Sequence, residues 1–278
     1  MTTRKTLLRV LFWVLLALCF NTGIYFFMGR EKALEFLGGY VLEQSLSVDN
    51  LFMFLMLFTN YGIRPNQQRR VLSYGIIGAV VLRLAFILLG VAVVNVFHWV
   101  LYIFGLVLII SGMGIVFKDD THSGFRDKKI LKVLGKVIPL TDRLYGERFF
   151  VRKGRTLYAT PLFAIIILIE LTDIIFAIDS IPAIFSITTD VFIVFSSNIF
   201  AILGLRSLYF ALGSLQERFR YVKYGVAMIL TFTGLKLLIM IFDIEIPVAA
   251  SLGIIASILL VSIFLSLAAS DKRLRNTV

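Results

Sequence analysis

The stretch ELTDIIFAIDSIP, residues 170–182, places three carboxylates inside a segment that otherwise has the composition of a membrane-spanning helix. The whole segment, residues 157–185, is long enough to cross a bilayer, because about 20 apolar residues suffice. An acidic residue at the centre of such a helix costs roughly 2.5–3.5 kcal/mol, so Glu170, Asp173 and Asp179 require cations, protons or polar partners. We therefore expect the function of the protein to reside in this stretch.

The composition of the chain is that of a polytopic membrane protein. Of its 278 residues, 59% are hydrophobic and the mean hydropathy is +0.93, whereas soluble domains contain about 45–50% apolar residues. The net charge of +11 does not indicate nucleic-acid binding, because Lys and Arg concentrate in the connections between apolar runs. The runs predict an all-α polytopic membrane protein with about eight transmembrane helices, at residues 7–28, 33–60, 70–94, 98–117, 157–185, 190–213, 221–242 and 248–268.

Basic residues are distributed unequally between the two sides of the predicted bundle. One side receives 23 of the 28 Lys and Arg residues, the other receives two, and three lie within spans. Because cytoplasmic connections carry the excess of positive charge, this bias predicts an inner-membrane protein with both termini in the cytoplasm.

The two halves of the chain resemble each other. EQSLSVDN (43–50) matches DIIFAIDS (173–180), with two acids six positions apart in each, and the next span of each half carries an arginine, Arg83 or Arg206. Because three spans make one copy, the second copy enters the membrane from the opposite side, which predicts an inverted three-helix repeat of spans 2–4 and 5–7. The predicted regions are a signal-anchor helix (1–30), repeat 1 (31–117), a cytoplasmic basic loop (118–156), repeat 2 (157–243) and a C-terminal span with a basic tail (244–278).

The spacing of the paired acids predicts interruptions in their helices. A six-residue step on a regular helix rotates by about 600°, so the two acids of a pair face about 120° apart. Convergence on one site therefore predicts helix breaks at Gly38 and Gly39 in the second span and at Pro182 in the fifth.

The polar residues of these spans favour binding of a hard cation. Oxygen ligands without Cys or His suit Mn²⁺, Mg²⁺ or Ca²⁺, and Asn50, Ser180 and Asn198 could complete the shell around the carboxylates. Since ligation requires ionised carboxylates, binding would release protons, which provides a route to cation/proton exchange. Arg83 and Arg206 are predicted counter-ions or gate residues, although structural ion pairs between these arginines and the acids are an alternative. No catalytic residues are expected, because an intramembrane aspartyl enzyme would leave the arginines and the extra acids without a role.

Two long polar segments resemble the TerC family, including its Alx-like manganese exporters: EQSLSVDNLFMF (43–54) and ELTDIIFAIDSIPAIFSITTDVFIVFSSNIFAILGLRSLYF (170–210). The family is named for tellurium resistance. The resemblance implies a protein of metal homeostasis that exports Mn²⁺ and needs no permanent cofactor. Its partners would be the divalent cation, the lipid bilayer and protons. Some members assist the insertion or metal loading of other membrane proteins, so such a scaffold is the alternative hypothesis. The metal path that the resemblance implies comprises Glu43, Asp49, Asn50, Glu170, Asp173, Asp179, Ser180 and Asn198.

Overall fold

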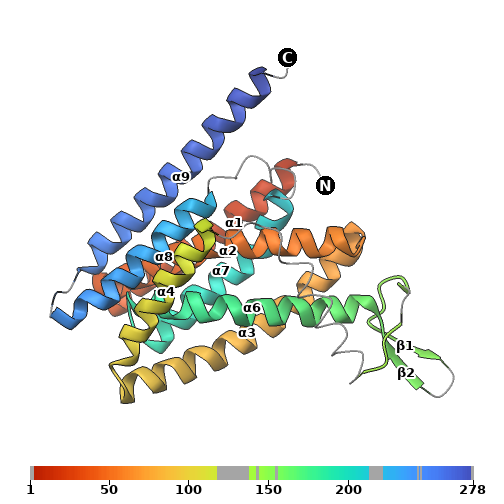
Figure 1. Cartoon of the computed structure of the whole chain (residues 1–278), viewed down its shortest axis with the longest axis horizontal. Helices are drawn as coiled ribbons and strands as arrows, with labels where there is room; N and C mark the ends of the chain where they lie inside the picture. Colours follow the sequence, from red (N-terminus) through yellow and green to blue (C-terminus); the bar gives the residue numbers. More distant parts are fainter. Residues whose placement is uncertain are drawn as a thin grey trace.

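The protein consists mainly of long α-helices, which Figure 1 shows together with one short β-hairpin. A computed structural model of the chain describes residues 3–117, 138–141, 144–153, 156–212, 222–242, 244 and 246–276. The elements are α1 (Thr3–Met28), α2 (Arg30–Asn60), α3 (Pro65–Val96), α4 (Val100–Phe117), β1 (Phe150–Lys153), β2 (Thr156–Ala159), α6 (Pro161–Phe185), α7 (Val191–Leu212), α8 (Val222–Ile239), the short 3₁₀ helix η3 (Met240–Phe242) and α9 (Val248–Asn276).

Six of the described helices are long and apolar enough to cross a membrane, which supports the predicted class of integral membrane protein. They are α1, α3, α6, α7, α8 and α9. Helix α4 contains a shorter apolar segment, Val100–Val116, and α2, which carries Glu43 in its interior, is not among the six. Two of the eight predicted spans, α2 and α4, are therefore helices, but their length and composition alone do not identify them as membrane-spanning.

Helices α2, α3, α6 and α7 form the middle of the bundle. An apolar core that includes Phe54, Phe58, Leu72, Ile165 and Tyr209 lies among these four helices. Helix α1 packs on α2 and α7, and α9 packs on α2 and α8. Figure 1 shows the α2–α3 connection and the β-hairpin at the right-hand end, and the α3–α4 and α8–α9 connections at the left-hand end.

Helices α4 and α8 approach so closely that their backbones touch. A methyl group on Gly105 would lie 2.8 Å from the carbonyl oxygen of Gly234, and one on Gly112 would lie 2.7 Å from that of Ala227. Small residues permit this approach, as they commonly do between membrane helices. The later glycine of α4, Gly112, contacts the earlier residue of α8, Ala227, so the two helices are antiparallel.

The fifth predicted span begins later than its apolar composition indicated. Leu157 belongs to β2, and α6 begins at Pro161. Proline is favoured in the first turn of a helix because its missing N–H would have no partner there. Residues 118–137 of the predicted cytoplasmic loop lie outside the described residues.

The helix breaks predicted at Gly38, Gly39 and Pro182 do not occur in the described structure. Helix α2 continues through both glycines, and α6 continues through Pro182 to its end three residues later. The glycines provide close packing instead, since a methyl group on Gly39 would lie 2.8 Å from Ser197 Oγ of α7. Pro182 lies in the last turn of α6, so the loss of its backbone N–H does not interrupt the helix interior.

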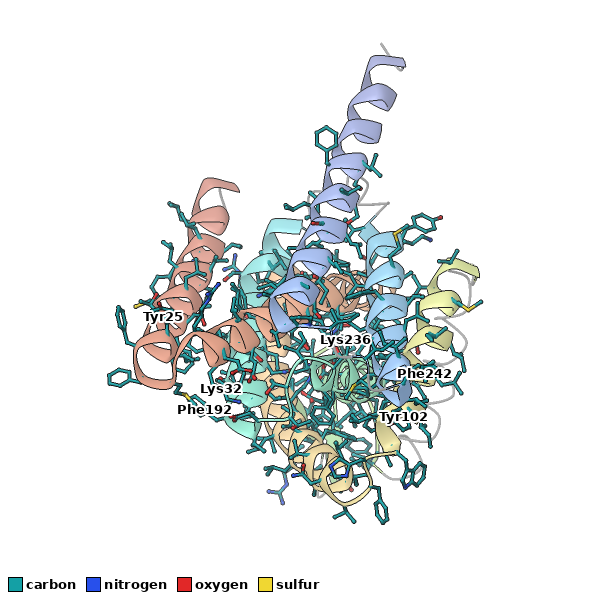
Figure 2. The ribbon with its side chains drawn as sticks, turned by 90° about the vertical axis from the view of Figure 1, so that its left-hand side faces the viewer. Tyr25, Lys32, Tyr102, Phe192, Lys236 and Phe242 are labelled. Atoms are coloured by element: carbon teal, nitrogen blue, oxygen red, sulfur yellow. The ribbon has the colours of Figure 1, made fainter. Side chains whose placement is uncertain are left out.

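Lys32 joins the starts of α2 and α7, and Figure 2, which looks onto the left-hand end of Figure 1, shows it beside Phe192. Its Nζ lies 2.9 Å from Glu35 Oε2 and 3.0 Å from Asp190 Oδ2. Asp190 Oδ1 also accepts the backbone N–H groups of Phe192 and Ile193, and so caps α7. Partial burial acts to raise the pKa of Asp190, but the hydrogen bond from Lys32 and the capping bonds outweigh it, and the pKa lies below its usual value. We call Lys32, Glu35 and Asp190 the Lys32 cluster.

Candidate functional site

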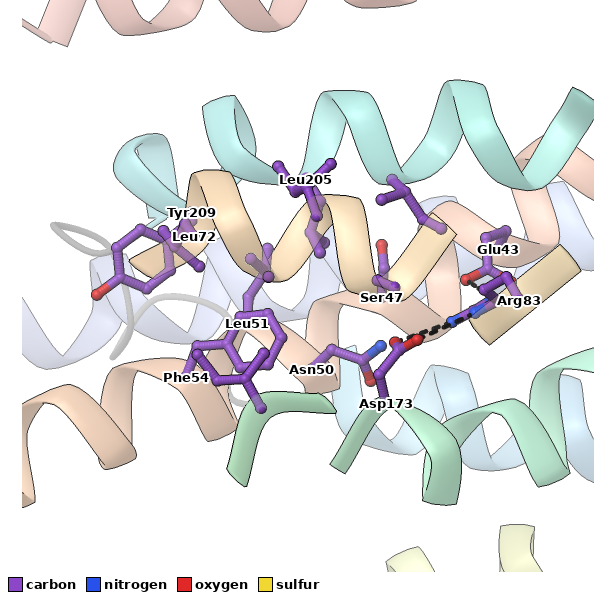
Figure 3. A pocket seen from close by; sticks show the side chains of 15 residues that line it. Glu43, Ser47, Asn50, Leu51, Phe54, Leu72, Arg83, Asp173, Leu205 and Tyr209 are labelled. Carbon is purple, nitrogen blue, oxygen red and sulfur yellow. Dashed lines mark hydrogen bonds and ion pairs between the residues drawn. The ribbon is translucent and has the colours of Figure 1, made fainter. Parts of the chain in front are cut away.

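Arg83 lies where α2, α3, α6 and α7 meet, and only 1% of the residue is exposed. Its Nη1 donates hydrogen bonds to Glu43 Oε1 at 2.5 Å and to Asn198 Oδ1 at 2.6 Å. Its Nε and Nη2 donate to the two carboxylate oxygens of Asp173, at 3.4 and 3.2 Å. Each of the four residues comes from a different helix. We call Glu43, Arg83, Asp173 and Asn198 the Arg83 centre, and Figure 3 shows its three charged members.

The Arg83 centre carries an excess of acidic groups. An arginine in a protein stays protonated, and its planar fork matches the two oxygens of a carboxylate, as it does here with Asp173. Glu43 provides a second carboxylate to the same guanidinium. With both acids ionised, the centre has a net charge of minus one, so it can accept further positive charge.

Several buried oxygen atoms of α2 and α6 have no hydrogen-bond partner within the part of the chain that the structure describes. They include Glu43 Oε2 and Asn50 Oδ1, both oxygens of Glu170, and Ser180 Oγ. A buried acceptor that remains unpaired costs about 1–3 kcal/mol. Such atoms therefore indicate positions where a bound ion, a proton or water completes the interactions.

Glu170 lies in a notch formed by two glycines of α3. A methyl group on Gly78 would overlap Glu170 Oε1 and lie 2.8 Å from Oε2, and one on Gly75 would lie 3.8 Å from Oε1. The backbone N–H groups in a helix interior are already bonded within the helix, so this notch has no donor for the carboxylate. The glycines provide the space for Glu170 but not a hydrogen bond.

Asp179 is not part of the Arg83 centre. Its Oδ1 accepts a hydrogen bond from Ser111 Oγ of α4 at 2.8 Å. Because α6 is continuous, the six-residue step from Asp173 turns Asp179 away by about 120°. Asp173 and Asp179 of α6 therefore contact different helices, α3 and α4.

The predicted metal path is brought together only in part. Three of its members, Glu43, Asp173 and Asn198, meet at Arg83, and Asn50 lines the same pocket. The backbones of Asp49 and Arg206 lie in α2 and α7, but their side chains are outside the described residues. Among the side chains that are described, no group of three or more Asp, Glu, His or Cys is placed to hold a metal ion.

A pocket extends from the Arg83 centre towards the α2–α3 end of the bundle (Figure 3). Its polar end includes Ser47 and Asn50 of α2, next to the three charged residues of the centre. Its other end is apolar, with Leu51, Phe54, Leu72, Leu205 and Tyr209.

Sequence reasoning missed three residues of this region. Ser47 and Tyr209 line the pocket, and Ser111 bonds to Asp179. The single serine inside the apolar segment 100–117 was a detectable signal for Ser111. Tyr209 had no such signal, because a tyrosine among apolar residues is equally typical of lipid-facing or core packing.

A bundle of membrane-type helices around a buried ionic centre defines an integral membrane protein with a polar site inside the bundle. The sequence matches the family described as "Integral membrane protein TerC family" over residues 28–274. The chain therefore belongs to the TerC family, as its polar helix segments indicated.

The relatives cover nearly the whole chain. It is 46% identical to "Putative membrane-bound redox modulator Alx" of Escherichia coli (strain K12) over 274 residues, which are 96% of this chain and 85% of the relative. A protein with the same name from Photorhabdus laumondii is 46% identical over 276 residues, with the same two coverages. "Uncharacterized membrane protein STKORF319" of Myxococcus xanthus is 45% identical over 256 residues, 92% of this chain and 80% of the relative. No solved structure matches the chain significantly.

Proposed function

We propose that the protein exports hard divalent cations, foremost Mn²⁺, through the Arg83 centre. The observation that carries the proposal is that Glu43 and Asp173 meet at one buried point, beside acceptors of Glu43 and Asn50 that are unpaired within the described residues. These donors are all oxygen atoms, which suit Mn²⁺, Mg²⁺ or Ca²⁺ better than soft metals. The resemblance to Alx-like manganese exporters, noted from the sequence, supports Mn²⁺ among these ions.

In the proposed cycle, the cation competes with Arg83 for Glu43 and Asp173. Arg83 holds the two acids together when no cation is bound, because two buried carboxylates without a counter-charge would be strongly destabilised. The cation is the substrate and not a resident cofactor. If the acids take up protons when the cation leaves, export is coupled to inward proton movement.

The proposal includes eight spans with both termini in the cytoplasm. The additional spans are α2 and α4, and the strong bias of Lys and Arg to one set of connections supports the orientation. Figure 1 agrees with alternating connections, because the α2–α3 connection and the α3–α4 connection lie at opposite ends of the bundle.

An inverted repeat of α2–α4 and α6–α8 is also part of the proposal. Helix α2 packs on α7 and α3 packs on α6, which are equivalent pairs under the repeat. Gly105 and Gly112 of α4 correspond to Ala227 and Gly234 of α8, because each pair is 122 residues apart in the sequence. The repeat therefore converts the Gly105–Gly234 contact into the Gly112–Ala227 contact, and both are present. Glu43 and Asp173, which correspond between copies, share Arg83. In this proposal the site lies at the interface of the repeats, where inverted-repeat transporters usually bind their substrates.

The name of the Alx relatives suggests a redox role, which dithiol chemistry in this chain cannot provide. The sequence has one cysteine, Cys19, which is exposed on α1. A single thiol cannot form an internal disulfide. We therefore propose transport, and no enzymatic reaction, as the activity of the Arg83 centre.

Metal counting in cells that express the protein tests the proposal. We expect wild-type protein to lower intracellular manganese several-fold after a manganese load, and Asp173→Asn to abolish this effect. Asp190→Asn, the same substitution in the Lys32 cluster, is the matched control and should retain export. Asp49→Asn and Asp179→Asn extend the test to the rest of the predicted path.

Liposomes with the purified protein and an imposed pH gradient identify the ion, with Mn²⁺, Mg²⁺ and Ca²⁺ compared directly. Flux that is equal in wild type and Asp173→Asn would contradict the Arg83 centre as the path. Absence of flux, together with co-purification of a stoichiometric membrane protein, would favour the scaffold function instead.

A further inference from the structure

The two ends of the pocket at the Arg83 centre differ in how they are closed. Towards the Lys32 cluster, α2 and α7 are in direct contact, since even a methyl group on Gly39 would meet Ser197 Oγ at 2.8 Å. Ser197 is fully buried and precedes Asn198, a partner of Arg83. The pocket does not extend in this direction. In the opposite direction it continues along apolar side chains until it reaches Tyr209 (Figure 3).

Tyr209 is held at the end of the pocket by one hydrogen bond of its hydroxyl and by contacts of its ring. Its hydroxyl donates a hydrogen bond to Gln68 Oε1 of α3 at 3.1 Å, and Gln68 Nε2 donates to the carbonyl oxygen of Ile63, in the α2–α3 connection, at 2.8 Å. Its ring makes an edge contact with Phe58 of α2, with centroids 5.7 Å apart. These contacts connect α7 to α2 and α3, and leave Tyr209 only 2% exposed.

We propose that Tyr209 is the gate of the entrance through which a cation reaches the Arg83 centre from the side of the α2–α3 connection. This inference rests on the proposed function for the identity of the ligand and the cytoplasmic assignment of that side. In the closed arrangement, Tyr209, Phe54 and Leu72 form an apolar constriction that excludes a hydrated ion. Loss of the Gln68 bond and rotation of the Tyr209 ring open the apolar half of the pocket to water, so the polar end becomes accessible from one side only.

Thiol labelling tests the gate without any metal. Because Cys19 is the single cysteine of the sequence, Cys19→Ser gives a background without thiols, and Ser47→Cys places a reporter at the polar end of the pocket. A charged, membrane-impermeant thiol reagent is applied to right-side-out and to inside-out vesicles. We expect slow labelling of the reporter protein that retains Tyr209. In Tyr209→Ala the labelling should be at least tenfold faster in inside-out vesicles and unchanged in right-side-out vesicles.

Tyr209→Phe keeps the ring and removes only the hydroxyl. We expect it to accelerate labelling about two- to tenfold, which is the equilibrium effect of one hydrogen bond. Tyr74→Phe is the matched control, since Tyr74 is exposed on α3 and contacts Phe149 outside the pocket. It should leave the rate unchanged. If Tyr209→Ala does not fold, the Tyr209→Phe comparison still decides the matter.

Equal labelling of the Tyr209 and Tyr209→Phe proteins, or acceleration from right-side-out vesicles, would overturn the gate. The result is independent of transport: accelerated labelling in a protein without cation flux supports the gate and contradicts the proposed function. Cation flux together with unchanged labelling supports the function and contradicts the gate.

Discussion

Two ionic clusters connect α2 to α7, and they differ mainly in their access to water. In the Arg83 centre, the side chains of Arg83, Glu43 and Asp173 are 2%, 1% and 8% exposed. In the Lys32 cluster, the Lys32 and Asp190 side chains are 32% and 28% exposed, whereas the Glu35 side chain is 10% exposed. The distances within the two clusters are similar, so geometry alone does not distinguish them. Water replaces a lost partner at the Lys32 cluster but cannot do so at the Arg83 centre, and the energetic consequences of substitution should therefore differ strongly.

The largest effect is expected for Arg83→Met. This change leaves Glu43 and Asp173 buried without their counter-charge, and we expect a loss of about 3–5 kcal/mol in the free energy of unfolding in detergent. Arg70→Met is the control, because the Arg70–Glu147 pair is 3.5 Å long, its side chains are 40% and 48% exposed, and it should contribute at most about 1 kcal/mol. Equal losses in the two variants would contradict the comparison.

Neutralising the acids sharpens this test. In the Arg83→Met background, Glu43→Gln and Asp173→Asn remove the uncompensated charges, and we expect most of the lost stability to return. A double-mutant cycle on purified protein measures this coupling. Additive losses would mean that the arginine stabilises by packing alone.

An intermediate effect is expected for Gly78→Ala. The new methyl group would overlap the carboxylate of Glu170, so we expect a loss of about 1–3 kcal/mol on thermal unfolding in detergent. In a Glu170→Ala background the same change should cost much less. Gly114→Ala, at a glycine of α4 with no atom within 4 Å of an added methyl group, is the matched control and should be neutral or slightly stabilising.

The smallest effect is expected for Asp190→Asn. Because the pKa of folded Asp190 is below its usual value, the ionised group stabilises the protein above the unfolded pKa of about 3.9. This contribution is lost as the pH falls through the folded pKa. Asn can still cap α7, so the variant isolates the charge effect, which should be at most about 1 kcal/mol at pH 7.

A pH series of melting temperatures from about pH 7 to pH 3 measures this contribution, with the unfolded Asp value near 3.9 as the reference. The difference between wild type and Asp190→Asn should be greatest at neutral pH and should decrease in acid. A difference that grows on acidification would contradict the assigned role of the Lys32 pair.

The fold could be predicted to a large extent because apolar runs of membrane length leave few alternatives to a helix. The start of α6 was wrong, because Leu157 is apolar in a strand as well as in a helix. The helix breaks were wrong for a different reason. Gly38 and Gly39 are compatible with a break or with close packing, and only the position of α7 shows which applies.

The sequence identified the residues of the candidate site but not the contacts between them. The acids, Arg83 and Asn198 were recognisable because charged and amide groups are costly in apolar helices. Their pairing depends on which faces of α2, α3, α6 and α7 meet, and periodicity within one helix contains no information about its neighbours. Asp173 and Asp179 therefore resembled one site in the sequence, although they contact Arg83 and Ser111 on different helices.

The sequence alone was sufficient to assign a mainly helical integral membrane protein of the TerC family with acids inside its helices, because hydropathy and residue identity are properties of the chain. The packing of the helices was needed to show that Glu43 and Asp173 share one arginine, that Glu170 lies in a glycine notch, and that Tyr209 lines the apolar end of the pocket. These features require side chains from separate helices within a few ångströms of each other, and that proximity arises from packing.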